Sequence, residues 1–216
     1  ALKKSGVRIL IRTTAFGLYD NGVAGLLERV TDHQSLPSQH DPRQRCWTVR
    51  AKHTILATGA LERHIAFGNN DLPGVMTASS ARTYLNRFAI LPGKKIIVCT
   101  NNDSAYLTAS DLSKAGADVK LIDARSNIKD DLSGEALRSG VALQMNTAPL
   151  KVKGFRSVKS LEVAIAEGEL WRRGSNENSD LVIVSGGWSP IVHLLSHRGV
   201  HPVWDNKNAC FIAGKH

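Results

Sequence analysis

Residues 94–125, KKIIVCTNNDSAYLTASDLSKAGADVKLIDAR, determine the fold class. The apolar run over 94–100 predicts a buried strand, the stretch after it predicts a helix closed by Gly116, and 117–125 predict a second strand. A strand, a helix of about a dozen residues and a further strand form the βαβ unit of a parallel sheet. We therefore expect an α/β fold.

The segments on either side of this unit extend the pattern. Residues 136–147 repeat the step from helix to strand, and 179–187, SDLVIVSGG, predict another buried strand that ends in small residues. A helix is expected over 77–89, starting at Thr77 or Ser79. These elements add helices and strands to the same sheet.

The amino-terminal part predicts antiparallel strands. The segment 1–6 is typical of the last turn of a helix, and 7–16 predict a strand because β-branched residues are frequent there. Asn21-Gly22 is a strong hairpin signal. We expect 7–57 to form a small antiparallel meander that returns into a main sheet, and a further hairpin around 151–172.

The stretch His53–Arg63, HTILATGALER, predicts a buried strand that runs into three small residues. Small residues at a strand end allow a bulky group to pass close to the backbone. Tight packing of the strand against a helix explains the same pattern. At this point both explanations stay open.

The order of these elements is the plan of a flavoprotein with two dinucleotide-binding domains, here incomplete. The chain opens and stops inside such a pattern, so we expect it to be the middle part of a longer protein. We expect residues 1–62 with 205–216 to form a partial dinucleotide-binding domain and residues 93–187 to form an inserted Rossmann-like domain. Residues 63–92 are expected to be a connector between them, and residues 188–204 a return segment.

Composition limits the classes of protein to which the chain can belong. Its net charge is +9 over 216 residues, which raises nucleic acid as a partner. No run of basic residues exceeds two, however, so a solvated basic surface or an acidic binding partner is favoured over nucleic acid. No apolar run approaches the length of a membrane span, and the start has no signal-peptide pattern.

The three cysteines, Cys46, Cys99 and Cys210, lie far apart. Without a Cys-x-x-Cys pair, the sequence encodes neither a zinc ribbon nor a dithiol redox centre. Such a sparse, odd number is typical of a reducing compartment, so we expect a cytoplasmic protein.

Three longer blocks resemble the alpha subunits of heterotetrameric sarcosine oxidases. They are VRAKHTILATGALERHIAFGNNDLPGVM, YLNRFAILPGKKIIVCTNNDSAYLTASDLSKAGADVKLIDAR and SDLVIVSGGWSPIVHLLSHRG, and the resemblance extends over nearly the whole chain. Opine oxidase and hydrogen cyanide synthase subunits share weaker versions of the same blocks.

The resemblance implies a reaction that belongs to a larger complex. In this family an amino-terminal glycine-rich unit binds NAD, and beta, gamma and delta subunits complete a heterotetramer that also holds FAD and FMN. The complex oxidises the small amine sarcosine to glycine, a one-carbon unit and hydrogen peroxide. The resemblance therefore predicts an oxidoreductase component, inactive alone and without tightly bound flavin. A component of a related amine or opine oxidase and a non-catalytic docking domain are the alternatives.

The resemblance also suggests cofactor-binding residues in the first domain. Thr58 and Gly59 match the small strand-end residues that line the dinucleotide. At these positions the glycine lets the polypeptide backbone come close to the ligand, and the threonine offers a hydroxyl. Ala15 follows the strand VRILIRTT and matches a position whose backbone pairs with an adenine edge. Ala15 is equally well explained as a simple strand end.

The turn of the inserted domain departs from a dinucleotide-binding turn, which needs Gly-x-Gly-x-x-Gly. Residues 100–105, TNNDSA, contain no glycine, so Asn102 or Asp103 is expected to cap the following helix and occupy the donors that a phosphate would use. Asp123 stands where a ribose-binding acid would, or it pairs with Arg125. We therefore expect no nucleotide at this turn.

Other residue patterns give no catalytic or metal site. His193, His197 and His201 recur at a spacing of four, but Gly199 and Pro202 interrupt a helix there. The segment 185–189, SGGWS, lacks the Gly-x-Ser-x-Gly pattern of hydrolases. Glu62-Arg63 is expected to anchor the connector by an ion pair.

Overall fold

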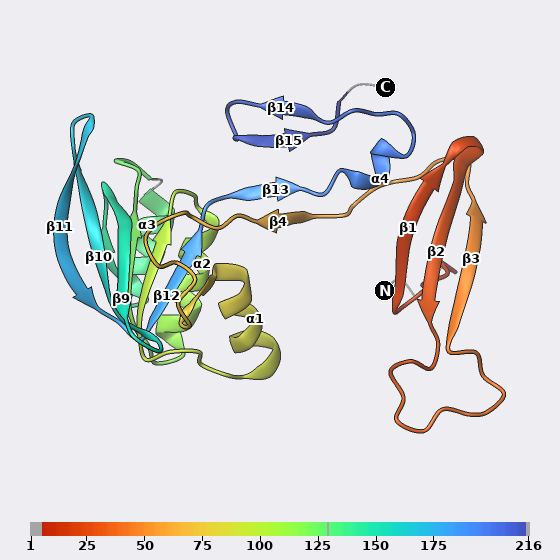
Figure 1. Ribbon diagram of the computed structural model, residues 1–216, viewed down its shortest axis with the longest axis horizontal. Coiled ribbons are helices and arrows are strands. Elements are labelled where there is room, and N and C mark those ends of the chain that lie inside the picture. Colours follow the sequence, from red (N-terminus) through yellow and green to blue (C-terminus); the bar gives the residue numbers. More distant parts are fainter. Residues whose placement is uncertain (1–5, 129, 215–216) are drawn as a thin grey trace. The chain divides into compact units, whose positions relative to one another are not determined.

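The computed structural model of the chain describes residues 6–128 and 130–214. The chain forms two compact units, one of residues 1–60 with 190–216 and one of residues 61–189 (Figure 1). The expected helix over 1–6 and the last two residues lie largely outside the described part. Each unit is described by itself.

A five-stranded sheet with strand order β5-β12-β6-β7-β8 forms the centre of unit 61–189. Its strands are β5 (Val75–Thr77), β6 (Lys95–Thr100), β7 (Asp118–Asp123), β8 (Ala142–Gln144) and β12 (Leu181–Ser185). All neighbouring pairs are parallel, for example Val98 of β6 beside Leu121 of β7 and Ile183 of β12. The expected α/β fold with a βαβ unit over 94–125 is confirmed.

Strands of this sheet are apolar on both faces because both faces are covered. On one face, Ile96, Val98, Leu121 and Ile183 pack with the helices α1 (Ala78–Phe88), α2 (Ser104–Lys114) and α3 (Asp130–Arg138). On the other face, the alternate residues pack against an antiparallel sheet; they are Ile97, Cys99, Ile122, Val182 and Val184. The unit therefore has three layers, with the core on both sides of the parallel sheet.

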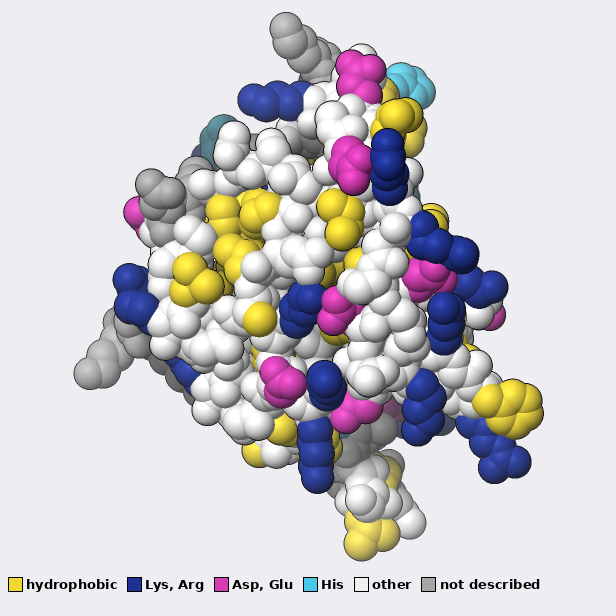
Figure 2. Space-filling model, turned by 90° about the vertical axis from the view of Figure 1, so that its left-hand side faces the viewer, with side chains coloured by type: hydrophobic (Ala, Val, Ile, Leu, Met, Phe, Trp, Pro, Cys, Tyr) yellow, Lys and Arg dark blue, Asp and Glu magenta, His cyan; other side chains and the backbone are white. Residues whose placement is uncertain are grey.

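The antiparallel layer consists of β9 (Thr147–Gly154), β10 (Val158–Glu167) and β11 (Leu170–Asn178). The hairpin expected around 151–172 is thus one part of a longer meander. Charges of both signs lie side by side on the face shown in Figure 2. In this meander Glu162 pairs with Lys153 and Arg173, and Arg172 pairs with Glu167. The β9–β11 meander therefore carries charges of both signs, several of them paired.

Residues 63–92, expected as a connector, are part of the compact unit 61–189. They contain β5, which adds to the parallel sheet, and α1, whose Ala78 and Ala81 are buried in the core. Thr77 caps this helix, because its side chain accepts a hydrogen bond from the Ser80 backbone. The helix was predicted at its observed place, but its burial was not.

Unit 1–60 with 190–216 contains small antiparallel sheets. The strands β1 (Thr13–Tyr19), β2 (Val23–Arg29) and β3 (Gln44–Arg50) form a meander, and β14 (Val203–Asp205) pairs with β15 (Cys210–Ile212). Asn21, at φ 57°, and Gly22, at φ 70°, form the β1–β2 turn, as the hairpin signal predicted. The first strand begins at Thr13 and not at residue 7, since Arg12 has a positive φ of 54°.

The buried strand predicted from residue 53 is wrong. Residues 53–59 form no strand, and Ile55 is 92% exposed. A parallel strand is stable only between neighbours, and none of the described strands flanks this segment. Regular pairing starts at the short strand β4 (Ala60–Glu62), which pairs with β13 (Trp188–Pro190).

The helices are short. The longest, α1 and α2, have 11 residues each, and α4 (His193–Ser196) is a single turn. A membrane-spanning helix needs about 20 apolar residues. Within residues 6–128 and 130–214, no helix is long and apolar enough to cross a membrane.

Candidate functional site

Thr58 and Gly59 lie close to residue 191 in unit 1–60 with 190–216. The Thr58 hydroxyl donates to the Ile191 carbonyl at 2.7 Å, and the Ile191 amide donates to the Gly59 carbonyl at 3.0 Å. Gly59 has a φ of +74°, and a Cβ there would meet no atom of the chain within 4 Å. The glycine is therefore required by its backbone conformation, and open space remains beside it.

Ala15 lies in a different element. It is exposed in β1 and pairs with Leu26 of β2, next to a register shift between Ala15 and Gly17. In the described part of the chain, the hydrogen bonds of Thr58 and Gly59 do not include Ala15. The role of these three residues in cofactor binding stays a prediction.

The carboxyl edge of the parallel sheet is the place where this type of fold binds ligands. Here Asn102 fills the space between β6 and β12. Its Nδ2 donates to the Ser185 carbonyl at 2.9 Å and to the Ser185 hydroxyl at 3.1 Å. Its Oδ1 accepts from the Ser104 amide at 3.1 Å and from the Ser104 hydroxyl at 2.6 Å. Asn102 therefore caps α2, as expected, and also binds the adjacent strand, which the sequence did not suggest.

The predicted ribose-binding position is occupied by an ion-pair cluster. Asp123 is fully buried, and its carboxylate accepts from Arg125 Nη2 at 2.8 Å and from the Tyr106 hydroxyl at 2.8 Å. Arg125 Nη1 also binds Asp103 at 2.6 Å. Burial and the hydrogen bond to Asp123 raise the pKa of Tyr106, and the hydrogen bond to Asp123 raises the pKa of Arg125. Pairing of Asp123 with Arg125, one of the two expected explanations, is the observed arrangement.

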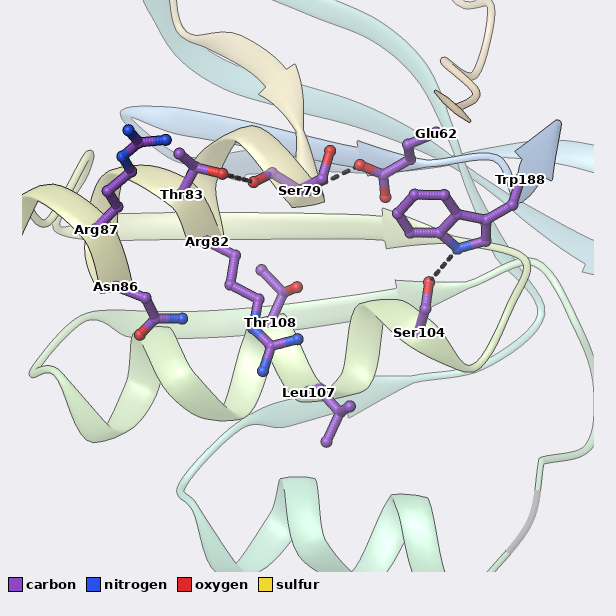
Figure 3. A pocket seen from close by; sticks show the side chains of 10 residues that line it. All are labelled: Glu62, Ser79, Arg82, Thr83, Asn86, Arg87, Ser104, Leu107, Thr108 and Trp188. Atoms are coloured by element: carbon purple, nitrogen blue, oxygen red, sulfur yellow. Dashed lines mark hydrogen bonds between the residues drawn. The ribbon is translucent and has the colours of Figure 1, made fainter. Parts of the chain in front are cut away.

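A groove of about 500 Å³ lies between α1 and α2 (Figure 3). The Trp188 indole lies at the end where both helices begin, and its Nε1 donates to the Ser104 hydroxyl at 2.9 Å. Arg82 binds Asp111 across the groove at 2.9 Å, and Arg87 lies near the other end of the groove. The groove is open, its lining surface is mostly apolar with several polar side chains, and its volume is in the range of small-molecule sites.

Glu62 and Arg63 anchor the start of this unit through the backbone. Glu62 Oε2 accepts from the Ser79 amide in the first turn of α1 at 2.7 Å, which is a favourable place for a carboxylate. The Arg63 amide donates to the Gly187 carbonyl at 2.9 Å, and its carbonyl accepts from the Gly186 amide at 2.8 Å. The anchor expected to be an ion pair is, for Glu62, a helix-terminus hydrogen bond.

The histidines and thiols form no reactive cluster in the described residues. No group of three or more His, Cys, Asp or Glu side chains there could hold a metal ion. The single-turn helix α4 ends at Ser196, and the His197 ring stacks on Tyr19 at 6.1 Å. Cys46, Cys99 and Cys210 are free thiols. The described residues therefore contain no dithiol redox centre.

Comparisons with known proteins agree with this architecture. A family model described as "Pyridine nucleotide-disulphide oxidoreductase" matches residues 2–208. The alpha subunit of sarcosine oxidase from Rhizobium meliloti (strain 1021) is 40% identical over 210 residues, which are 96% of this chain and 20% of that protein. An opine oxidase subunit from Agrobacterium tumefaciens (strain Ach5) is 28% identical over 76% of this chain and 35% of its own. The predicted resemblance to sarcosine oxidase alpha subunits is confirmed.

A solved structure supports the fold independently. Thioredoxin reductase from T. acidophilum superposes with a TM-score of 0.62 at 15% identity, covering 92% of this chain and 64% of that one. The chain spans about a fifth of the length of the Rhizobium meliloti sarcosine oxidase subunit. By its family match and its three-layer α/β architecture, the chain belongs to the pyridine nucleotide-disulphide oxidoreductase family.

Proposed function

We propose that the chain acts as part of the alpha subunit of a sarcosine-oxidase-like enzyme. The observation that carries the proposal is the 40% identity to the Rhizobium meliloti alpha subunit over 96% of the chain. The proposed overall reaction takes sarcosine, oxygen and water to glycine, formaldehyde as the one-carbon unit, and hydrogen peroxide. Beta, gamma and delta subunits are the proposed partners, and the cytoplasm is the proposed location.

The proposed role of this chain is to form part of the alpha-subunit fold and to position the dinucleotide. When bound, flavin supplies the hydride acceptor, and NAD is the proposed dinucleotide of the alpha subunit. Thr58, Gly59 and Ala15 are the proposed dinucleotide contacts. The open space beside Gly59 supports this role, because it leaves room for a dinucleotide to approach the polypeptide backbone. No residue of the chain is proposed to act as an acid or base.

A second candidate is a component of an opine-oxidase-like enzyme. It is supported by the 28% identity to the Agrobacterium tumefaciens opine oxidase subunit, which is lower and covers 76% of the chain. Both candidates oxidise a substituted amine, and they differ in the substituent on nitrogen.

A chimera tests the proposal. The matched 210-residue stretch of the Rhizobium meliloti alpha subunit is replaced by this chain, and the chimeric protein is expressed with its partner subunits. We expect an assembled complex that releases peroxide with sarcosine and not with an opine. Assembly and turnover only when this chain replaces the matched stretch of the Agrobacterium tumefaciens opine oxidase subunit, expressed with that enzyme's own partners, would favour the second candidate.

The matched control is a chimera that carries the corresponding region of the thioredoxin reductase, which has the same fold at 15% sequence identity. We expect this control to fail in assembly or in turnover. An assembled but inactive complex with this chain would contradict the proposed function. Equal activity of the two chimeras would show that any domain of this fold suffices.

A further inference from the structure

A dinucleotide-binding turn must leave two features available at the start of its helix. The backbone amides of the first turn must be free to bind the pyrophosphate, and glycines must let the phosphate come close. In unit 61–189 this place is the turn between β6 and α2, at the edge where β6 and β12 lie next to each other.

The first amide of α2, that of Ser104, is already in use. Asn102 Oδ1 lies 3.1 Å from the Ser104 amide and 2.6 Å from its hydroxyl, so a side-chain oxygen takes the position of a phosphate oxygen. The Nδ2 of the same side chain binds Ser185 on the neighbouring strand, which fixes Asn102 in place from the other side. Thr100 also holds Asn102 in place, because the Thr100 hydroxyl accepts a hydrogen bond from the Asn102 backbone amide at 3.1 Å.

The surrounding charges oppose an anion as well. Asp103 places a carboxylate at the helix start, and Arg125, which lies beside it, binds both Asp103 and Asp123. Asp123 is fully buried, with Arg125 and Tyr106 as donors, so its carboxylate is not available to a ribose hydroxyl. The Ser104 amide and the Asp123 carboxylate, two groups that a dinucleotide would bind here, therefore already have partners within the chain.

We infer that the Asn102 side chain fills the phosphate position of unit 61–189, so that this unit takes no dinucleotide although its family is defined by one. The cluster of Asn102, Ser104 and Ser185 is instead a structural clamp between β6 and β12. The inference rests on the geometry of the turn and not on the proposed reaction. It can therefore stand or fall separately from the proposed function.

A titration of the full chain with pyrophosphate and with NAD tests the inference. Backbone amide resonances are followed at Ser104, Ala105 and Asp123 in the wild type and in Asn102→Gly, which removes the side-chain amide and restores a glycine. We expect no saturable shift in the wild type at millimolar ligand. The variant should bind pyrophosphate at least about tenfold more tightly, and its Ser104 amide should exchange faster with solvent.

Asn101→Gly is the matched control, because Asn101 is the exposed neighbour and its replacement keeps Asn102 with its bonds to Ser104 and Ser185, losing the 3.3 Å hydrogen bond from Asn102 Nδ2 to Asn101 Oδ1. We expect this control to behave like the wild type. Saturable shifts at Ser104 or Ala105 in the wild type would overturn the inference, and so would equal pyrophosphate affinity of the two glycine variants. The wild-type titration decides the matter even if Asn102→Gly fails to fold.

Discussion

Replacing Arg125 by Gln should destabilise unit 61–189 strongly, because it removes the counter-ion of a buried carboxylate. Asp123 is fully buried, while the Arg125 side chain is 31% exposed and binds it through Nε and Nη2. Removing one partner of a buried ion pair costs about 3–5 kcal/mol. Asp123 keeps two other donors, the Tyr106 hydroxyl and the backbone amide of residue 125, so we expect the lower end, about 3 kcal/mol.

The matched control for this prediction is Arg82→Gln. Arg82 and Asp111 form a pair at 2.9 Å, but their side chains are 45% and 29% exposed. A pair of this kind contributes about 0.5 kcal/mol. The two variants thus remove the same chemical group from a buried and from a solvated partner.

Hydrogen exchange of the β6 and β12 amides in increasing urea measures the unfolding free energy of this unit for each variant. Because these strands form the middle of the parallel sheet, their amides report its opening. A loss of less than about 1 kcal/mol for Arg125→Gln would refute the reasoning, as would a loss equal to that of the control.

Three further predictions follow from burial and charge. Ile183→Ala should cost about 3–4 kcal/mol, since Ile183 is fully buried, whereas Ile55→Ala at a 92% exposed position should change the unfolding free energy by less than about 0.5 kcal/mol. A thiol reagent at mild alkaline pH should modify Cys46 at once and Cys99 only after unfolding, because burial raises the pKa of the Cys99 thiol; equal rates would contradict this. The Ser175 hydroxyl and Lys120 lower the pKa of Glu177, so the contribution of Glu177 to stability is present above pH 4.5 and is lost as the pH falls. Glu177→Gln should therefore weaken the pH dependence of stability in acid unfolding curves, and an unchanged curve would contradict this prediction.

The βαβ unit was predictable because its signals are local. The continuous apolar run of β6 and the closing Gly116 of the next helix depend only on nearby residues, and the structure has both elements at the expected places. The same holds for the cap of α1 at Thr77 and for the Asn21-Gly22 turn. Each of these features follows from backbone preferences that a neighbouring strand does not change.

The errors arose where burial depends on distant partners. The apolar stretch from residue 53 has the composition of a buried strand, but no described strand flanks it, and Ile55 is exposed. Conversely, β5 has only three residues, too few for a periodic pattern, and it still extends the parallel sheet beside β12. Composition alone cannot show which neighbour a segment will have.

The same limit applies to the site. The missing glycines at residues 100–105 were visible in the sequence, and they correctly suggested that a side chain caps α2. That Asn102 also binds Ser185, and that Ser104 holds the Trp188 indole, required the fold to bring three separate segments together. The Gly-Gly after β12 was a local sign that this strand end lies close to another backbone, and Gly186 does approach the Arg63 carbonyl.

Photoaffinity labelling tests most directly where the proposed dinucleotide site of the assembled enzyme lies. The assembled chimeric oxidase is loaded with 8-azido-NAD, irradiated and digested, and the labelled peptides are identified by mass spectrometry. The account predicts label on peptides that contain Ala15 or residues 53–63, and none on residues 100–106 or 123–125. Label on the turn after β6 would contradict it, because that turn is closed by Asn102.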